Sequence, residues 1–285
     1  RTAASVAYRL GFAAWIARTR GRGIALARRK RHAAWAVSTF GARFRLVLEV
    51  HEVDSRQAAD PADAAAAHAL EATVLRAAWG VIANADGTLS ELRDAHRRLP
   101  PARVIHNAAR PGAVPAADSH GVGVVGAVRP YKDPQTVAAA AAQLDQPVTW
   151  VGATVADGLG DVVVEAPVPY RDVPARIGRF RTLVVPLSPG LFGERLTSPL
   201  KLWDALASGI PVVAADTPAI RAAAGDAFLP YVPGDPASLA RAITLASTDP
   251  AVRASLIARA RGRARTWDQR ASEVEAFLAE TAGSR

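Results

Sequence analysis

The segment TSPLKLWDALASGIPVVA, Thr197–Ala214, constrains the fold more than any other part of the chain, because a short helix leads directly into a buried strand. Ser198 is a favourable N-cap residue, and Pro199 suits the first position of a helix. We therefore expect a helix over Pro199–Ser208 and a strand over Pro211–Ala214. A helix joined to a strand by so few residues is typical of α/β domains.

The polar face of this helix predicts an anion-binding site. Lys201 and Asp204 lie one turn apart, on the face opposite Leu202 and Leu206. The free N–H groups and the dipole at a helix N-terminus attract phosphate, and Lys201 adds a positive charge. The carboxylate of Asp204 accepts hydrogen bonds from sugar hydroxyls. A nucleoside diphosphate would fit such a surface, although a capped helix with solvated charges explains this segment by itself equally well.

Composition excludes several classes of site. The chain has 285 residues, half of them apolar, which suits one large domain or two medium ones. It has no cysteine, and its six histidines show no metal-ligand spacing, so we expect neither thiol chemistry nor a metal site. No apolar run reaches the ~18 residues of a membrane span, so we expect a cytoplasmic protein. There is no methionine even at position 1, and we expect residues to precede the printed chain.

The net charge of +9 is concentrated at the N-terminus. Residues 1–48 contain eleven Arg and Lys and no acidic residue, whereas the remainder contains 24 basic and 26 acidic residues. Basic side chains beside Phe12, Trp15 and Trp35 favour contact of residues 9–45 with an anionic membrane surface. A solvated basic face is an equally good interpretation. Nucleic acid ranks lower, because no recognition motif accompanies the charge, and we expect no nucleic-acid partner.

From residue 45 onward, segments with the pattern of strands alternate with segments typical of helices. Short, uniformly apolar strands are typical of parallel sheets buried on both faces, and the segment Pro111–His120 predicts a linker between two such series. The sequence therefore predicts an α/β protein with two doubly wound Rossmann-like domains, in which ligands bind beyond the carboxyl ends of the strands. The expected strands are Arg45–Val50, Gly80–Ala83, Arg103–His106, Val122–Val125, Val148–Val151, Asp161–Ala166 and Thr182–Pro186. The expected helices are Ala62–Ala78, Thr88–Leu99, Pro134–Leu144, Asp172–Arg179, Ile220–Ala223 and Pro236–Ala246, with further helix after Pro250.

The segment GVGVVG, Gly121–Gly126, matches the G-x-G-x-x-G pattern of dinucleotide-binding proteins. In those proteins the glycines follow a strand and open a helix. Here Val122–Val125 form the expected strand themselves, and Pro130 and Pro134 delay the next helix. No acidic residue ends the following strand. An NAD-type site is therefore a minor alternative.

The exit of this strand, GAVRPYKDP, is more informative. Gly126 permits a close approach of the backbone to a ligand. Arg129 and Lys132 follow in a loop at the carboxyl end of the strand, where two cations suit a diphosphate or a leaving group that gains negative charge. For this loop alone, a pair of solvated charges is the simpler explanation.

Four segments, GAVRPYKDP, SPLKLWDALASGIPVVA, PGDPASLARAI and TWDQRA, occur here in the same order as in a known family. From about residue 45 to its end the chain resembles the retaining, nucleotide-sugar-dependent glycosyltransferases of the GT-B fold, family-4 type. The resemblance is strongest over Val122–Glu280. It implies an acceptor-side domain over residues 1–112, a nucleotide-sugar donor domain over 113–266, and a helix over 267–285 that crosses back to the first domain. We expect the N-terminal domain to be incomplete, because it has no early glycine-rich loop.

The resemblance implies a site for the donor diphosphate, made of a basic loop and the start of a helix. Gly126, Arg129 and Lys132 match the basic loop. The helix start and its phosphate contacts are matched by Ser198, Pro199, Leu200 and Lys201.

Other positions match parts of the family's site for the sugar, the ribose, the base and the acceptor. Asp204 stands where the family usually has a glutamate that binds the ribose hydroxyls. Val168 lies in VPYRD, which resembles the turn beside the base. The family's first acidic residue would be at Leu196, so we expect Glu194 to reach the donor sugar instead. His51 resembles the active-site histidine of the N-terminal domain.

The expected function is transfer of a sugar from a nucleotide-diphosphate sugar to an acceptor hydroxyl with retention, in glycan or glycolipid synthesis. We expect His51, Arg129 and Lys132 to be catalytic, with no metal and no cofactor besides the nucleotide-sugar co-substrate. The expected partners are a glycan or lipid-linked acceptor and an anionic membrane surface at the inner face of the membrane. Because Ala127 replaces a common arginine and Leu196 an acidic residue, the alternative is a non-catalytic nucleotide- or glycan-binding protein on a degenerate GT-B scaffold.

Overall fold

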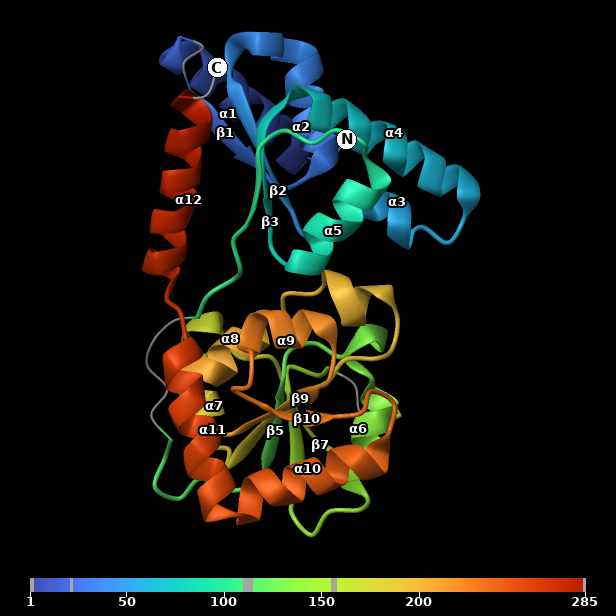
Figure 1. Cartoon of the computed structure of the whole chain (residues 1–285), viewed down its shortest axis with the longest axis vertical. Helices are drawn as coiled ribbons and strands as arrows, with labels where there is room; N and C mark the ends of the chain where they lie inside the picture. Colours follow the sequence, from blue (N-terminus) through green and yellow to red (C-terminus); the bar gives the residue numbers. More distant parts are fainter. Residues whose placement is uncertain (1–2, 21–22, 110–114, 155–157, 284–285) are drawn as a thin grey trace. The chain divides into compact units, whose positions relative to one another are not determined.

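The computed structural model describes residues 3–20, 23–109, 115–154 and 158–283, which form two compact units (Figure 1). Unit 1 contains Arg1–Asn84, Thr88–Ile105 and Glu273–Arg285, and unit 2 contains Ala85–Gly87 and His106–Ser272. The chain changes unit earlier than the 112/113 division expected from the sequence, and later than 266/267, because Ala109 pairs with Thr266 inside unit 2. Part of the linker predicted over Pro111–His120 lies outside the described residues.

Unit 1 is built on a four-stranded parallel sheet in the order β1-β2-β3-β4. Its strands are β1 (Ile24–Ala27), β2 (Arg45–Val50), β3 (Ala78–Ala83) and β4 (Ala102–Val104). Its helices before the last are α1 (Ala3–Thr19), α2 (Lys30–Phe40), η1 (Gly41–Arg43), α3 (Asp54–Gln57), α4 (Pro61–Ala77) and α5 (Asp86–Ala95). The sequence predicted β2 with the bounds found here. It did not predict β1, because this edge strand is short and lies between arginines.

The C-terminal helix α12 (Trp267–Gly283) belongs to unit 1 from Glu273 onward. Phe277 is buried there against Val47, Ile82 and Ile105 on the sheet. The packing is close, because a Cβ atom added to Gly80 in β3 would lie 2.9 Å from the Phe277 ring. The end of the chain therefore supplies part of the core of the first sheet.

The aromatic residues of the basic N-terminal segment pack against one another. The Phe12 ring centroid lies 5.2 Å from that of Phe44, 5.6 Å from that of Phe40 and 6.1 Å from that of Trp35. Trp15 joins the same cluster, with its ring centroid 5.2 Å from that of Phe12. These contacts account for the aromatic side chains without a membrane. Within the described residues, none of the helices combines the length and the hydropathy that crossing a bilayer requires.

Unit 2 is a six-stranded parallel sheet in the order β10-β9-β8-β5-β6-β7. Its strands are β5 (Val122–Val125), β6 (Val148–Val151), β7 (Val163–Glu165), β8 (Thr182–Val185), β9 (Val212–Ala215) and β10 (Leu229–Tyr231). Its helices and helical turns are η2 (Pro130–Lys132), α6 (Pro134–Ala141), η3 (Tyr170–Asp172), α7 (Val173–Ile177), η4 (Phe192–Leu196), α8 (Leu200–Ala207), α9 (Pro218–Ala224), α10 (Pro236–Thr248) and α11 (Pro250–Arg263). Two parallel α/β units confirm the predicted fold class.

The glycines of GVGVVG serve the sheet rather than a dinucleotide. Gly123 lies inside β5, where an added Cβ atom would lie 2.3 Å from the Phe180 ring. Only Gly126 lies beyond the strand, and no helix opens before Pro130. The arrangement therefore lacks the strand–glycine turn–helix geometry of an NAD-type site.

Candidate functional site

The strand order of unit 2 reverses between β5 and β8, which pair with each other through Val122, Gly123 and Val124. From β5 the sheet continues through β6 and β7, and from β8 it continues the other way through β9 and β10. Connections that leave neighbouring strands in opposite directions open a crevice at their carboxyl ends, which is where doubly wound proteins bind ligands. A ligand site is therefore expected at the residues that follow β5 and β8.

Gly126 shapes the exit of β5. Its φ of +109° is a conformation that other residues rarely adopt, and its N–H donates to the Val151 carbonyl at 2.7 Å. Its carbonyl accepts a hydrogen bond from Trp150 Nε1, also at 2.7 Å. A Cβ atom at this position would lie 2.6 Å from the Nζ atom of Lys132. The glycine thus lets a lysine ammonium lie directly against the backbone at the mouth of the sheet.

Positive charge is concentrated at this point. Burial, together with the charges of Lys201 and Arg129, lowers the pKa of Lys132 to about 8. Among the described residues, neither Lys132 nor Arg129 has a carboxylate partner. A cluster of like charges is held together at a free-energy cost that a bound anion would remove.

The start of α8 differs from the sequence prediction. The helix begins at Leu200, one residue later than expected, and Pro199 occupies the N-cap position without a side-chain hydrogen bond. Ser198 is not the cap, because its hydroxyl meets Trp203 Nε1 at 3.5 Å and its carbonyl accepts from Asn107 Nδ2 at 2.8 Å. The first N–H groups of α8 therefore have no side-chain cap, which leaves them to water or a ligand.

Lys201 and Asp204 are paired with each other, at 2.9 Å between Nζ and Oδ2. The Asp204 side chain is only 6% exposed, whereas that of Lys201 is 25% exposed. Lys201 Nζ also lies 5.2 Å from the centroid of the Tyr170 ring. The structure thus brings Gly126, Lys132, Lys201 and Asp204 together in unit 2, with an aromatic ring beside them.

Three other positions singled out from the sequence contact their own loop or the protein interior. Glu194, in the single turn η4, accepts a hydrogen bond from the Gly190 N–H at 3.0 Å, so its carboxylate closes its own loop. Leu196 is completely buried, which leaves no carboxylate at the family's first acidic position. Val168 packs against the core, and the exposed aromatic residue of its segment is Tyr170.

His51 follows β2 in unit 1, where both of its ring nitrogens are engaged. Nε2 lies 3.0 Å from Glu49 Oε1, and Nδ1 lies 3.4 Å from Asn84 Nδ2. Asn84 Oδ1 accepts from Thr88 Oγ1 at 3.1 Å, which turns the amide nitrogen toward His51. In this arrangement Asn84 Nδ2 donates to His51 Nδ1, and His51 Nε2–H donates to the Glu49 carboxylate. His51 also lines a cavity of about 830 Å³.

Sequence reasoning missed two residues that the structure places at the unit 2 site. Asn107 is buried and donates to the carbonyl of Ser198, the residue before the N-cap of α8. Its one signal was a polar side chain just beyond a predicted strand. Tyr170 stood inside a segment that was singled out for its neighbour Val168. No group of three or more potential metal ligands occurs within the described parts of the chain.

A comparison with protein families finds a match over the part of unit 2 that contains this candidate site. Residues 119–249, which contain β5, the basic loop and α8, match the family Glycosyl transferases group 1. HepE from Anabaena in complex with UDP superposes with a TM-score of 0.77, at 18% identity, over 94% of this chain and 81% of that one. The chain has a GT-B fold. No match is found among curated proteins.

Two further GT-B structures are similar. Sucrose-phosphate synthase from Thermosynechococcus elongatus is 18% identical over 92% of this chain and 74% of that one, with a TM-score of 0.75. TarM from S. aureus, as a mutant in complex with Fondaparinux, alpha-GlcNAc-glycerol and UDP, is 16% identical over 84% of this chain and 51% of that one, with a TM-score of 0.64. At these identities the likeness defines the fold alone.

Proposed function

We propose that the chain transfers a sugar from a nucleotide-diphosphate sugar to an acceptor hydroxyl, with retention of the anomeric configuration and without a metal. The observation that carries the proposal is the cluster of Arg129, Lys132 and Lys201 at the point where the strand order reverses. HepE, which shares the fold, was solved with UDP, and a diphosphate is the anion that such a cluster suits.

The cation cluster has a direct role in the proposed reaction. When the bond between the anomeric carbon and the phosphate oxygen breaks, the nucleoside diphosphate gains negative charge. Arg129, Lys132 and Lys201 stabilise that charge, and at the start of α8 the backbone N–H groups of Ser198 and Leu200, on either side of Pro199, contribute as well. Lys132 gains most from the ligand, because a nearby anion restores the charge that burial disfavours.

Retention is part of the proposal, because the positions expected to supply a carboxylate for the donor sugar offer none that is free. Leu196 is apolar and buried, and Glu194 is engaged with its own loop. Asp204 is buried beside Lys201, and we assign it to the ribose hydroxyls. In the proposed reaction a phosphate oxygen of the departing diphosphate takes the proton of the acceptor hydroxyl, so that the acceptor attacks on the face from which the donor leaves.

The remaining assignments concern the acceptor side. His51 lines the cavity of unit 1, and we assign it to the acceptor sugar rather than to proton transfer, because both ring nitrogens are already hydrogen-bonded. The proposed setting is glycan or glycolipid synthesis at the cytoplasmic face of a membrane, where the basic residues of 9–45 meet anionic lipid.

A non-catalytic nucleotide- or glycan-binding protein is the second candidate. Two observations favour it: Leu196 is fully buried where the family has a carboxylate, and Ala127 is the residue after Gly126. Such a protein would keep the affinity for the diphosphate and lose turnover.

The test begins with a thermal-shift panel of UDP, GDP, ADP and NAD on the whole chain, in buffer with EDTA. The proposal expects one nucleoside diphosphate to raise the melting temperature and NAD to leave it unchanged. Arg129→Gln should reduce the shift, and Arg241→Gln, an exposed arginine of α10, serves as the matched control. Sugar nucleotides of the base so identified are then followed by NMR for the anomeric configuration of the product. Nucleotide binding without turnover on any sugar donor would favour the second candidate, and an inverted product would refute retention.

A further inference from the structure

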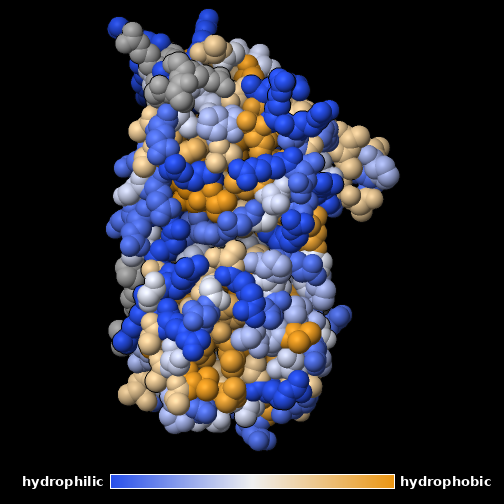
Figure 2. All heavy atoms as spheres, viewed as in Figure 1, coloured by the Kyte–Doolittle hydropathy of each residue, from blue (hydrophilic) through white to orange (hydrophobic). Residues whose placement is uncertain are grey.

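Unit 1 contains a cavity of about 830 Å³ at the carboxyl ends of β1 and β2, a size typical of pockets for small ligands. Polar groups dominate its walls. The residues that matter for its chemistry are Arg28, Arg29, Arg31, His51, Glu52 and Asp63. Figure 2 shows that hydrophilic side chains border the apolar surface on the visible face of this unit.

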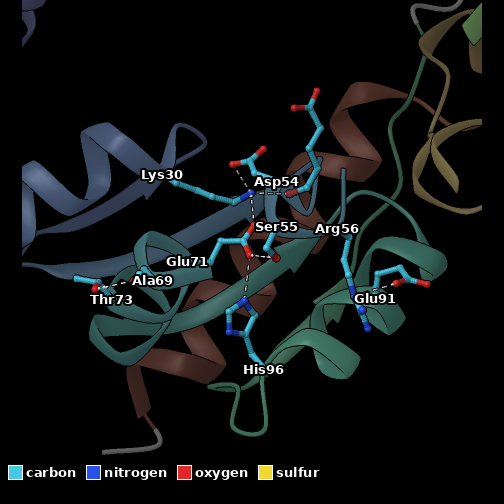
Figure 3. Close-up of polar contacts among 10 residues, drawn as sticks. Lys30, Asp54, Ser55, Arg56, Ala69, Glu71, Thr73, Glu91 and His96 are labelled. Atoms are coloured by element: carbon cyan, nitrogen blue, oxygen red, sulfur yellow. Dashed lines mark hydrogen bonds and ion pairs between the residues drawn. The ribbon is translucent and has the colours of Figure 1, made fainter. Parts of the chain in front are cut away.

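Lys30 also lines the cavity, but its ammonium is already paired with the carboxylates of Asp54 and Glu71 (Figure 3). Its Nζ atom lies 2.9 Å from Glu71 Oε1 and 2.9 Å from Asp54 Oδ2. Glu71 in turn accepts from Ser55 Oγ at 2.6 Å, and His96 Nε2 lies 3.1 Å from the same oxygen. This buried network fixes the start of α2 against α4 and leaves Lys30 no charge to offer a ligand.

The three arginines around Lys30 are placed differently. Arg28, Arg29 and Arg31 are exposed, and among the described residues none of them has a carboxylate partner. They stand at the start of α2, whose N-cap residue Arg29 makes no side-chain cap hydrogen bond. Cations at the N-terminus of a helix oppose its dipole, so this arrangement is unfavourable until an anion occupies it.

The acidic residues of the cavity restrict the kind of anion. Glu52 and Asp63 line the same space, and they would repel a ligand that is negatively charged over its whole surface. These carboxylates instead suit the hydroxyl groups of a sugar. The combination favours a ligand with one anionic end and a neutral, hydroxyl-rich body.

We propose that this cavity binds a sugar bearing one oxyanion, a phosphoryl or carboxylate group, which Arg28, Arg29 and Arg31 hold. As the acceptor of the reaction this ligand rests on the proposed function, because an acidic acceptor is then bound in unit 1 and the nucleotide in unit 2. The binding step itself does not depend on catalysis.

Isothermal titration of the whole chain with glucose 6-phosphate, glucuronate, glucose and inorganic phosphate tests the proposal. Either acidic sugar, or both, should bind at least tenfold more tightly than glucose and than inorganic phosphate, and comparison of the two tells a phosphoryl from a carboxylate ligand. Equal binding of glucose and both acidic sugars would overturn the role of the arginines. Equal binding of inorganic phosphate would overturn the sugar, leaving a simple anion site.

The variants separate this cavity from the nucleotide site. Arg28→Gln and Arg31→Gln should each weaken the acidic sugar at least fivefold, whereas Arg43→Gln, an exposed arginine of η1 outside the cavity, should not. All three should bind nucleoside diphosphate and melt like the parent chain. Unchanged binding of the acidic sugar in both cavity variants would overturn the proposal. If the acidic sugar binds and no nucleotide does, the proposed function is refuted, whereas the proposed sugar site in the cavity is confirmed.

Discussion

Lys201 Nζ lies 2.9 Å from Asp204 Oδ2, so two residues assigned to different groups of the donor are paired with each other in the free protein. The pair orders the lysine beside the start of α8 before any ligand arrives. It also offsets part of the positive charge that Lys132 and Arg129 would otherwise feel. A diphosphate therefore meets a cluster that is already positioned, at the cost of weakening one partly buried ion pair.

Single substitutions of Lys201 and of Asp204 separate the binding of phosphate from the binding of ribose. Lys201→Met removes a charge-assisted hydrogen bond, worth roughly 1.5–3 kcal/mol, and should weaken both nucleoside diphosphate and inorganic pyrophosphate about tenfold or more. Asp204→Asn keeps the lysine and should weaken the nucleotide while leaving pyrophosphate as tight or tighter. Titration calorimetry of both ligands measures this. Parallel losses for both ligands in Asp204→Asn would contradict the ribose assignment.

The depressed pKa of Lys132 predicts that nucleotide binding takes up a proton near pH 8. The free protein holds the pKa at about 8, below its ordinary value of 10.5, and a bound diphosphate raises it again. Affinity should therefore fall as pH rises above about 8. Without ligand the sign is opposite for stability: the unfolded chain binds more protons between about 8 and 10.5, so this group makes folding more favourable as pH rises through that window.

Calorimetry in buffers of different ionisation enthalpy counts the protons taken up at pH 8. Lys132→Arg keeps a positive charge at every pH tested and should abolish both the uptake and the fall in affinity. An affinity that is flat from pH 7 to 9 in the parent chain would mean that Lys132 does not face the anion.

Gly126→Ala tests whether the lysine must lie on the backbone of the β5 exit. A φ of +109° is strained for alanine, and strain of this kind costs about 1–3 kcal/mol of stability. The new Cβ would also lie 2.6 Å from Lys132 Nζ and displace it, so nucleotide affinity should fall. In a Lys132→Ala background the nearest remaining side-chain atom is Lys201 Cγ at 3.9 Å, and the added methyl should then change affinity little. Equal losses in the two backgrounds would trace the effect to the backbone alone.

The central strands of the unit 2 sheet were predictable because they are buried on both faces, whereas the edge strand β10, which is partly exposed, was not predicted. Val122–Val125 and Val148–Val151 were found with the predicted bounds, since continuous apolar runs between loop residues leave few alternatives. By contrast β1 includes Leu26, which is 44% exposed, and arginines follow it, so its pattern did not stand out.

The charged residues of the unit 2 site were predictable from the sequence, but the contacts of Ser198 at the start of α8 were not. Lys132 and Lys201 follow from the positions of strand exits and helix starts, which local sequence signals define. Ser198 was expected to cap α8, but Asn107, 91 residues away, holds its carbonyl, and Trp203 meets its hydroxyl. Tertiary contacts of this separation leave no trace in a local pattern.

Binding to anionic vesicles tests the role assigned to the basic N-terminal segment. Each Lys or Arg near such a surface contributes about 1 kcal/mol, and salt screens the attraction. The chain should sediment with anionic vesicles at low salt and be released at high salt. Neutral vesicles are the control, and equal recovery with them would count against the electrostatic contact.

Glu71→Gln should destabilise unit 1 far more than removal of an exposed carboxylate. Burial alone would raise the pKa of Glu71, but hydrogen bonds from Ser55, Lys30 and His96 and the charge of Lys30 hold it below its ordinary value. Losing that charge beside Lys30 should lower the free energy of unfolding by about 3 kcal/mol, near the lower end for a broken buried pair, because Asp54 still contacts Lys30.

The matched control is Glu280→Gln, which removes a surface pair with Arg103 and should change the free energy of unfolding by less than about 1 kcal/mol. The pH dependence gives a second readout. Because the pKa of Glu71 is lowered by folding, its contribution is present above the ordinary carboxyl pKa and is lost as pH falls through the folded value. Urea unfolding between pH 3 and 7 should therefore show a smaller acid loss in Glu71→Gln than in the parent chain. If the free energy of unfolding fell equally with pH in both proteins, the Glu71 network would not hold α2 against α4.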